Sequence, residues 1–267
     1  MASHFVLVHG ACHGSWCWYK VATLLKSAGH TVTAVDLGGA GINPKQRHQL
    51  TTLADQLEPL MELMAALQPE EKVILVGHSM GGIAVSIAAE KFTKNVAAAV
   101  FVAAFMPNPD FNLHQFYRQL FNSQPDSNDK QVTEAGVLNF QDSRFTFEER
   151  EDSSSFLFRP NILRSTLYQL SPPEDLTLAS SLVRPMPIFR DHASLKAAEL
   201  TNKGYGSIRR VYIVSQGDLI IPEKIQREII LDYPPQDVKE ISDSDHMVMF
   251  SQPRELASLL QVVAEEM

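Results

Sequence analysis

Short apolar runs alternate with longer segments of helical periodicity over the first hundred residues of the chain. Apolar runs of this length, each followed by a helical pattern, are typical of parallel strands that helices cover on both faces. The predicted strands are Phe5–Val8, Thr31–Val35, Val73–Val76 and Val96–Val102, and the predicted helices between them include Tyr19–Ala28 and Leu53–Leu67. The alternation predicts an α/β fold with a mostly parallel central sheet.

The alternating pattern is interrupted between residues 107 and 203 and then resumes. Strand-like runs return at Arg210–Val214 and near Val238–Ile241, and a final helix is predicted over Pro253–Glu265. The stretch between shows little strand pattern and combines phenylalanines, polar tracts and short helical segments. We interpret the chain, residues 1–267, as a single domain with a cap inserted at about residues 108–203. A separate small domain is the alternative.

The glycine-flanked serine of Gly77–Gly81 follows the strand predicted over Val73–Val76, and a helical pattern follows it. The sequence there is Gly-His-Ser-Met-Gly, and Gly-x-Ser-x-Gly between a strand and a helix is typical of a nucleophile elbow. Side chains at the two glycines would crowd the turn, and the helix N-terminus would direct backbone N–H groups at an anion. Ser79 is therefore the predicted nucleophile. The alternative is a serine that only caps the helix.

A nucleophilic serine needs a base and an acid that orients the base, and in α/β hydrolases these follow the serine in the order acid, histidine. His246 follows the last predicted strand and is the predicted base. Asp218 follows the strand before it and is the predicted acid, although Asp243 and Asp245 lie nearer to the histidine in sequence. The side chain of Asp245 cannot easily reach the far ring nitrogen of its neighbour, so we expect it to shape the turn.

Two backbone N–H groups are expected to hold the oxyanion that forms on attack. One belongs to Met80, directly after the nucleophile. The second should come from the loop after an early strand, and we assign it to Ala11, with Gly10 permitting the backbone to approach. The alternative for His9 and Gly10 is an ordinary turn beside a buried histidine.

Composition and charge exclude several classes of partner. The net charge is −8 and no cluster of lysine and arginine is present, which argues against nucleic acid and anionic membranes. The cysteines, Cys12 and Cys17, are too few for a disulfide framework and lack zinc-site spacing, so no metal is expected. The N-terminal residues show no secretory signal and no run is long enough to span a membrane, so we expect a cytoplasmic protein.

Several segments resemble the plant methylesterase branch of the α/β-hydrolase superfamily, and together they cover nearly the whole chain. The segments are His4–Gly14, Val73–Gly82, Phe101–Pro107, Ser171–Pro185, Tyr205–Val214 and Ser244–Met247. The resemblance implies an α/β-hydrolase fold and a serine carboxylesterase with catalytic Ser79, Asp218 and His246. It also implies an apolar pocket under a cap, no cofactor, and often a homodimer.

The same family contains plant hydroxynitrile lyases, which differ from the esterases at three positions. The lyases carry threonine, glutamate and lysine where this chain has Gly10, His78 and Met247. A lysine ammonium beside the base would stabilise a cyanide leaving group, which a methionine cannot do. A related decarboxylase that forms methylketones has alanine at the nucleophile position, where this chain has Ser79. All of these positions favour an esterase.

The predicted reaction is hydrolysis of a methyl ester of a small apolar carboxylic acid, a plant hormone or specialised metabolite, through an acyl-enzyme. The alternatives are an alkaloid-ester esterase whose product decarboxylates, a lyase-like enzyme, and a small-molecule binding protein. The predicted substrate-binding residues are Gly10, His78, Phe105 and Met247, and further candidates for the pocket wall are Phe116, Phe140, Phe145 and Leu176. Apolar walls with few polar anchors suit an aromatic or cyclic acid.

Overall fold

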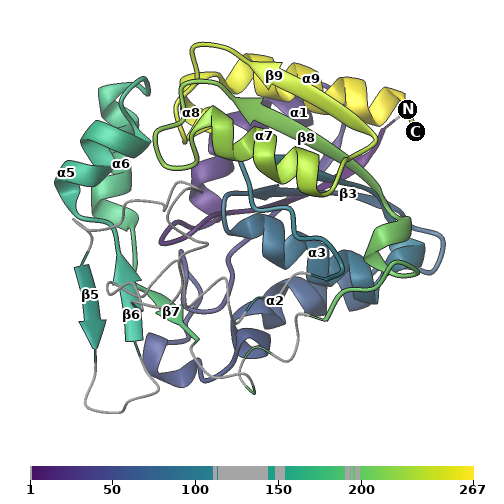
Figure 1. The fold of residues 1–267 in the computed structure, drawn as a ribbon, viewed down its shortest axis with the longest axis horizontal. Helices are drawn as coiled ribbons and strands as arrows, with labels where there is room; N and C mark the ends of the chain where they lie inside the picture. The colour runs from purple at the N-terminus through teal and green to yellow at the C-terminus, as the bar shows by residue number, and fades with distance from the viewer. Residues whose placement is uncertain are drawn as a thin grey trace.

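A single parallel sheet of six strands organises the computed structural model, which describes residues 2–110, 144–147, 154–189 and 199–267 and the single residues 113, 193 and 195. The strand order is β2-β1-β3-β4-β8-β9, and every neighbouring pair is parallel (Figure 1). The strands are β1 (His4–Val8), β2 (Thr31–Val35), β3 (Val73–His78), β4 (Val96–Val102), β8 (Arg209–Ser215) and β9 (Asp237–Ile241). The predicted α/β fold is thereby confirmed.

Helices cover both faces of this sheet, with α1 packed against α9 on one face and α2 packed against α3 on the other (Figure 1). The helices of the sheet layer are α1 (Tyr19–Ser27), α2 (Leu53–Ala65), α3 (Gly81–Lys91), α7 (Glu223–Asp232), α8 (Val248–Ser251) and α9 (Pro253–Glu265). Short helical turns are η1 (Ser15–Trp18), η2 (Arg47–Gln49), η3 (Thr93–Asn95) and η6 (Tyr205–Ser207). None of the described helices is both long and apolar enough to cross a bilayer.

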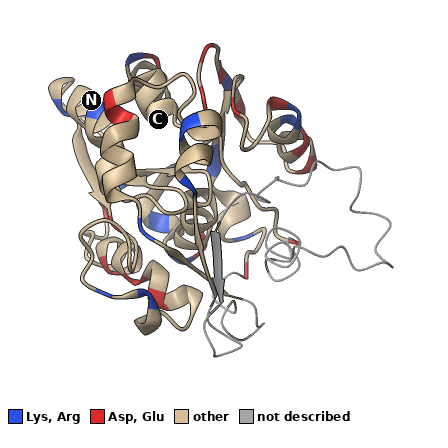
Figure 2. Cartoon of the chain, turned by 90° about the vertical axis from the view of Figure 1, so that its left-hand side faces the viewer, with Lys and Arg blue, Asp and Glu red and all other residues tan. Residues whose placement is uncertain are grey.

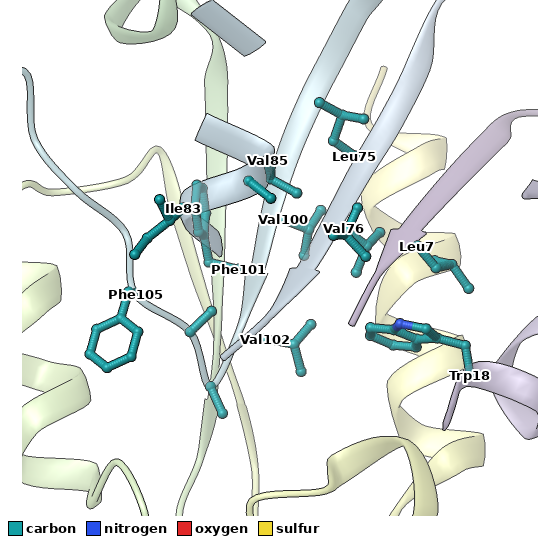
Figure 3. Close-up of a cluster of buried hydrophobic side chains, with 14 of the residues drawn as sticks. Leu7, Trp18, Leu75, Val76, Ile83, Val85, Val100, Phe101, Val102 and Phe105 are labelled. Atoms are coloured by element: carbon teal, nitrogen blue, oxygen red, sulfur yellow. The ribbon is translucent and has the colours of Figure 1, made fainter. Parts of the chain in front are cut away.

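Local sequence explains where these elements begin and end. Helix α2 begins at a capping box, in which Asp55 N–H donates to Thr52 Oγ1 at 3.1 Å and Thr52 N–H donates to Asp55 Oδ2 at 2.8 Å. Helix α1 ends at Ser27, and Gly29, directly after the C-cap residue, has a φ of 89°, the left-handed conformation that glycine adopts after helix C-termini. Because helices cover both faces, the central strands are mostly apolar, as the packed side chains of Leu7, Val76 and Val100 show (Figure 3).

The chain between β4 and β8, which we call the inserted segment, carries a second, antiparallel sheet of three strands in the order β5-β6-β7. Its elements are β5 (Arg144–Phe147), β6 (Ser154–Leu157), α5 (Pro160–Ile162), the π-helical turn η4 (Leu163–Leu167), α6 (Pro173–Leu182) and β7 (Met186–Ile188). Figure 1 shows this segment beside the main sheet rather than within it. That the segment acts as a cap stays a prediction.

The small sheet has strands that the sequence pattern of this stretch does not indicate. Its strands are only three or four residues long, and β7 contains Pro187 while β6 begins with two serines. Such runs are too short and too irregular to show the alternation by which a strand is recognised in sequence. Figure 2 shows positions of Lys and Arg interspersed with positions of Asp and Glu along the described elements.

The strand order reverses direction between β1 and β3, because the chain places β2 on one side of β1 and β3 on the other. In open α/β sheets, ligands bind beyond the carboxyl ends of the strands at such a switch point. The loop after β1 and the turn after β3 therefore lie side by side where a site is expected. These are the two segments that carry the predicted oxyanion loop and the predicted nucleophile.

Candidate active site

Ser79 lies in a strained turn between β3 and α3, with a φ of 53° that non-glycine residues rarely adopt. The glycines around it are required by close approach: a Cβ on Gly77 would lie 2.7 Å from Gly81 O, and one on Gly81 would lie 2.6 Å from His9 O. Ser79 O accepts hydrogen bonds from the N–H groups of Gly82 and Phe105 at 3.1 and 3.2 Å. The strand, sharp turn and helix expected from the motif are therefore all present.

A continuous chain of hydrogen bonds joins Ser79, His246 and Asp218. His246 Nε2 lies 3.1 Å from Ser79 Oγ, and His246 Nδ1 lies 2.7 Å from Asp218 Oδ2. A carboxylate can only accept, so His246 Nδ1 carries the proton and Nε2 is free to accept the serine hydroxyl. All three side chains are buried. This is the geometry by which a histidine removes a proton from a serine.

The other oxygen of the Asp218 carboxylate is fixed by the backbone. Asp218 Oδ1 accepts from the N–H groups of Ile220 and Ile221 at 2.7 and 2.9 Å. The carboxylate plane is thus held in place independently of the histidine that it orients. Preorganised groups of this kind need not rearrange as charge develops on the imidazole.

The loops after β8 and β9 are joined to each other by a buried pair of serines. Ser215 Oγ and Ser244 Oγ lie 2.7 Å apart, and Ser215 Oγ also donates to Asp245 O at 2.8 Å. Gln216 N–H donates to Ile241 O at 3.1 Å. The loops of the acid and the base therefore follow adjacent strands and are also hydrogen-bonded to each other.

The peptide between Gly10 and Ala11 is oriented by His9. His9 Nε2 accepts from Leu37 N–H at 3.1 Å, so its Nδ1 carries the proton and donates to Gly10 O at 2.8 Å. Burial lowers the pKa of His9, which keeps the imidazole in this neutral form. Since the C=O and N–H of a trans peptide point in opposite directions, the Ala11 N–H is directed away from His9.

The two N–H groups predicted as oxyanion donors are both available. In the described part of the chain, neither the Ala11 N–H nor the Met80 N–H donates a hydrogen bond to another residue. Gly10 brings the first of them close to the nucleophile, because a Cβ on Gly10 would lie 2.8 Å from Ser79 Cβ. Their role as oxyanion donors stays a prediction.

The residues predicted to bind substrate surround the triad. His78 Nε2–H donates to His246 O at 2.8 Å, and the centroids of the two rings lie 4.7 Å apart. Burial lowers the pKa of His78 well below its ordinary value. Met247 is buried beside the base, and Phe105 is buried as a member of the hydrophobic cluster that Figure 3 shows. Their contact with a substrate stays a prediction. Leu176 is half-buried on α6, whereas Phe116, Phe140 and the Phe145 side chain lie outside the described residues.

A hollow lies beside the oxyanion loop, between that loop, α2, α3 and β7. Its lining includes Gly10, Met80, Gln56 and Arg184 but neither Ser79 nor His246. The hydrogen-bond chain, and not this hollow, locates the chemistry, because the reacting groups must lie within hydrogen-bond reach of one another. No group of three or more potential metal ligands occurs among the residues that the structure describes.

Comparison with known proteins places these features in a family. Residues 3–253 match the family described as the alpha/beta hydrolase fold. The chain belongs to this family, in its plant methylesterase branch. Methyl jasmonate esterase 1 of Vitis vinifera is 48% identical over 98% of this chain and 97% of that protein. Salicylic acid-binding protein 2 of Nicotiana tabacum is 46% identical over 97% of this chain and 96% of that protein.

A solved structure agrees with the sequence relatives. The crystal structure of polyneuridine aldehyde esterase, 38% identical, aligns with a TM-score of 0.87 over 99% of this chain and 100% of that chain. In this α/β hydrolase, the order of the residues along the chain predicted that Ser79, Asp218 and His246 act together. The structure places them in hydrogen-bond contact. Sequence reasoning gave no role to His13 or Tyr168, since a contact between residues 155 positions apart leaves no local sequence signal.

Proposed function

We propose that the chain hydrolyses methyl esters of small apolar carboxylic acids through an acyl-enzyme. The observation that carries the proposal is the hydrogen-bonded chain from Ser79 Oγ through His246 to Asp218, with backbone N–H groups available beside the serine. A pocket that only binds a ligand needs no such chain. The names of the methyl jasmonate and polyneuridine aldehyde esterases support the same class of reaction.

In the first half of the reaction, Ser79 Oγ attacks the ester carbonyl carbon while His246 Nε2 takes the serine proton. The negative charge passes to the carbonyl oxygen, which the N–H groups of Met80 and Ala11 hold. Asp218 stabilises the imidazolium that forms on His246. The tetrahedral intermediate then collapses, the bond to the methoxy oxygen breaks, and His246 gives its proton to the departing methanol.

In the second half, water replaces methanol beside the base. His246 Nε2 takes a proton from the water as its oxygen attacks the acyl carbon, and the same N–H groups hold the new oxyanion. When the bond to Ser79 Oγ breaks, His246 returns the proton to the serine. The acid is released and the enzyme is restored.

Three residues support an esterase over a cyanohydrin lyase. Gly10 leaves no room for a side chain beside the nucleophile, since a Cβ there would lie 2.8 Å from Ser79 Cβ. His78 is held by the carbonyl of His246, and Met247 places no charge beside the base. The cytoplasmic location, the small-molecule ester as partner, and the homodimer remain predictions.

The test is a panel of methyl esters of salicylate, jasmonate, indole acetate and an alkaloid acid, assayed for acid release. Ser79→Ala is expected to abolish hydrolysis, with a loss on the order of 10⁶ in turnover. Ser86→Ala is the matched control, because Ser86 is also a buried serine and its hydroxyl donates to Gly82 O within α3 rather than to a histidine. Hydrolysis by Ser79→Ala at near the wild-type rate would refute the mechanism.

A further inference from the structure

The four residues Tyr168–Ser171 lie between η4 and α6 within the inserted segment. They form hydrogen bonds with three of the four segments that carry candidate catalytic groups, namely the loops after β1, β8 and β9, and, among the described contacts, none with the turn after β3 that carries Ser79. The turn η4 leads directly into them, and Tyr168 N–H donates to Leu163 O, five residues earlier, at 2.9 Å. Turns of this π-helical kind are frequent at functional sites.

The first contact reaches the oxyanion loop through a histidine. Tyr168 O–H donates to His13 Nε2 at 2.7 Å, and His13 Nδ1–H donates to Ala11 O at 2.8 Å. Burial lowers the pKa of His13 to about 3, so the ring is neutral and can accept at one nitrogen while it donates at the other. The rings of Tyr168 and His13 are stacked with centroids 5.9 Å apart. The Ala11 carbonyl can only accept, so it fixes the ring proton on His13 Nδ1, and Tyr168 holds the ring in place through the other nitrogen.

The second contact reaches the loop of the acid. Gln169 Nε2 donates to Gly217 O at 2.8 Å, one residue before Asp218. A side chain on Gly217 would lie 2.6 Å from Ser244 O, so this loop also packs tightly against the loop of the base. Movement at Gly217 would be passed directly to the carboxylate that follows it.

The third contact reaches the loop of the base. Asp245 Oδ2 accepts from Leu170 N–H at 2.9 Å and from Ser171 Oγ–H at 2.8 Å, one residue before His246. The other oxygen of Asp245 accepts from Met247 N–H at 3.0 Å. Asp245 is fully buried, and a buried carboxylate must be held by hydrogen bonds of this kind. Its role is thus to anchor the turn to the inserted segment as well as to shape it.

We propose that Tyr168–Ser171 is a positioning strap that fixes the oxyanion loop, the acid loop and the base loop relative to one another. The proposal rests on the function proposed above. The segment is suited to this role because hydrogen bonds attach it to all three loops. The side chain of Leu170 is exposed, so it is the backbone of this residue that makes the contact. None of the described hydrogen bonds joins its residues to Ser79, Asp218 or His246, so the segment acts through the loops that carry Ala11, Asp218 and His246. Small errors in the placement of catalytic groups lower the reaction rate steeply.

A second attachment of the inserted segment provides a matched control. Tyr19 O–H donates to Asp175 Oδ1 at 3.0 Å, and Lys20 Nζ lies 2.5 Å from Asp175 Oδ2, which fastens α6 to α1. This attachment involves none of the three loops. Tyr19→Phe and Tyr168→Phe each remove one tyrosine hydroxyl bonded across the inserted segment, and only Tyr168→Phe releases the oxyanion loop.

The kinetic test measures hydrolysis of p-nitrophenyl acetate, whose short acyl group makes little contact with a pocket wall. We expect Tyr168→Phe and Ser171→Ala each to lower kcat about tenfold and to change KM less than about twofold, as loss of placement in the transition state requires. Ser171→Thr, which keeps a hydroxyl, should restore most of the rate. Tyr19→Phe should keep the wild-type kcat. Equal kcat values for Tyr19→Phe and Tyr168→Phe, in folded proteins of equal melting temperature, would overturn the strap.

Amide hydrogen exchange provides a readout that does not depend on activity. If the strap couples the loops, Tyr168→Phe should speed exchange in residues 9–14, 215–221 and 243–248, although the lost hydroxyl contacts only the first of these. Faster exchange confined to residues 9–14 would overturn the coupling. A wild-type protein that hydrolyses no ester would contradict the proposed function alone, and the exchange measurement would then decide on the strap.

Discussion

Asp218→Asn probes how the acid is held, because the structure dictates which way the new amide must face. Asp218 Oδ1 accepts from two backbone N–H groups, those of Ile220 and Ile221. An amide nitrogen cannot replace that oxygen without leaving two buried donors unpaired, so the asparagine oxygen takes this place. The NH₂ group then faces His246 Nδ1, where the carboxylate oxygen lies 2.7 Å away in the wild type.

That orientation reverses the tautomer of the base. An NH₂ group donates, so His246 Nδ1 must accept and the ring proton moves to Nε2. Nε2 would then donate to Ser79 Oγ across the 3.1 Å contact and could no longer remove its proton. Loss of the correct tautomer costs about 10⁴ in kcat, which is about 5.4 kcal/mol at 1.36 kcal/mol per factor of ten.

Asp245→Asn is the matched comparison, since Asp245 is a buried carboxylate one residue from His246. It has three donors to satisfy with one oxygen and one NH₂ group, so we expect a loss of about 1–3 kcal/mol in the free energy of unfolding. The loss in kcat should be far below that of Asp218→Asn. The assay is steady-state ester hydrolysis with urea unfolding of both variants. If Asp245→Asn proved the slower enzyme, the assignment of the acid would be wrong.

Three further outcomes are expected. Gly10→Ala should lower kcat/KM by about 100-fold, because its Cβ would lie 2.8 Å from Ser79 Cβ; a change below threefold would contradict this. Phe105→Ala should raise KM for a bulky methyl ester more than for an acetate ester, whereas equal changes with a lower melting temperature would show a packing role. The free energy of unfolding should fall as pH drops from 6.5 toward 3, since the unfolded chain protonates His13 and the folded chain does not, contributing up to about 1.4 kcal/mol per pH unit. Urea unfolding of His13→Gln should show a shallower pH slope.

The parts of this protein that sequence predicts are those with local causes. Helix α9 and strands β2 and β4 have the predicted bounds, because a run of apolar residues or a helical period defines each of them. The triad could be predicted for a related reason. In this fold its members follow strands in a fixed order, so chain order alone distinguished His246 from the other histidines.

The parts that sequence did not predict depend on contacts between distant segments. His13 and Tyr168 are 155 positions apart, and nothing near either residue indicates the other. Asp245 was expected only to shape its turn, because its bonds to Leu170 and Ser171 come from a segment 74 and 75 positions away. The strands of the inserted segment were missed because pairing, rather than their own short sequences, makes them strands.

The pairing register of β1 and β3 sets the distance between the two loops that follow these strands. Val8 pairs with Gly77 in parallel register, so the oxyanion loop and the elbow leave the sheet side by side from bonded neighbours. A slip of one residue would displace one loop from the other by about 3.3 Å, more than a hydrogen bond can tolerate. The separation of the two loops where they leave the sheet is therefore inherited from backbone pairing, which side-chain substitutions leave in place. Beyond the strands, the conformation of the loop after β1 depends on side-chain contacts such as that between His13 and Tyr168.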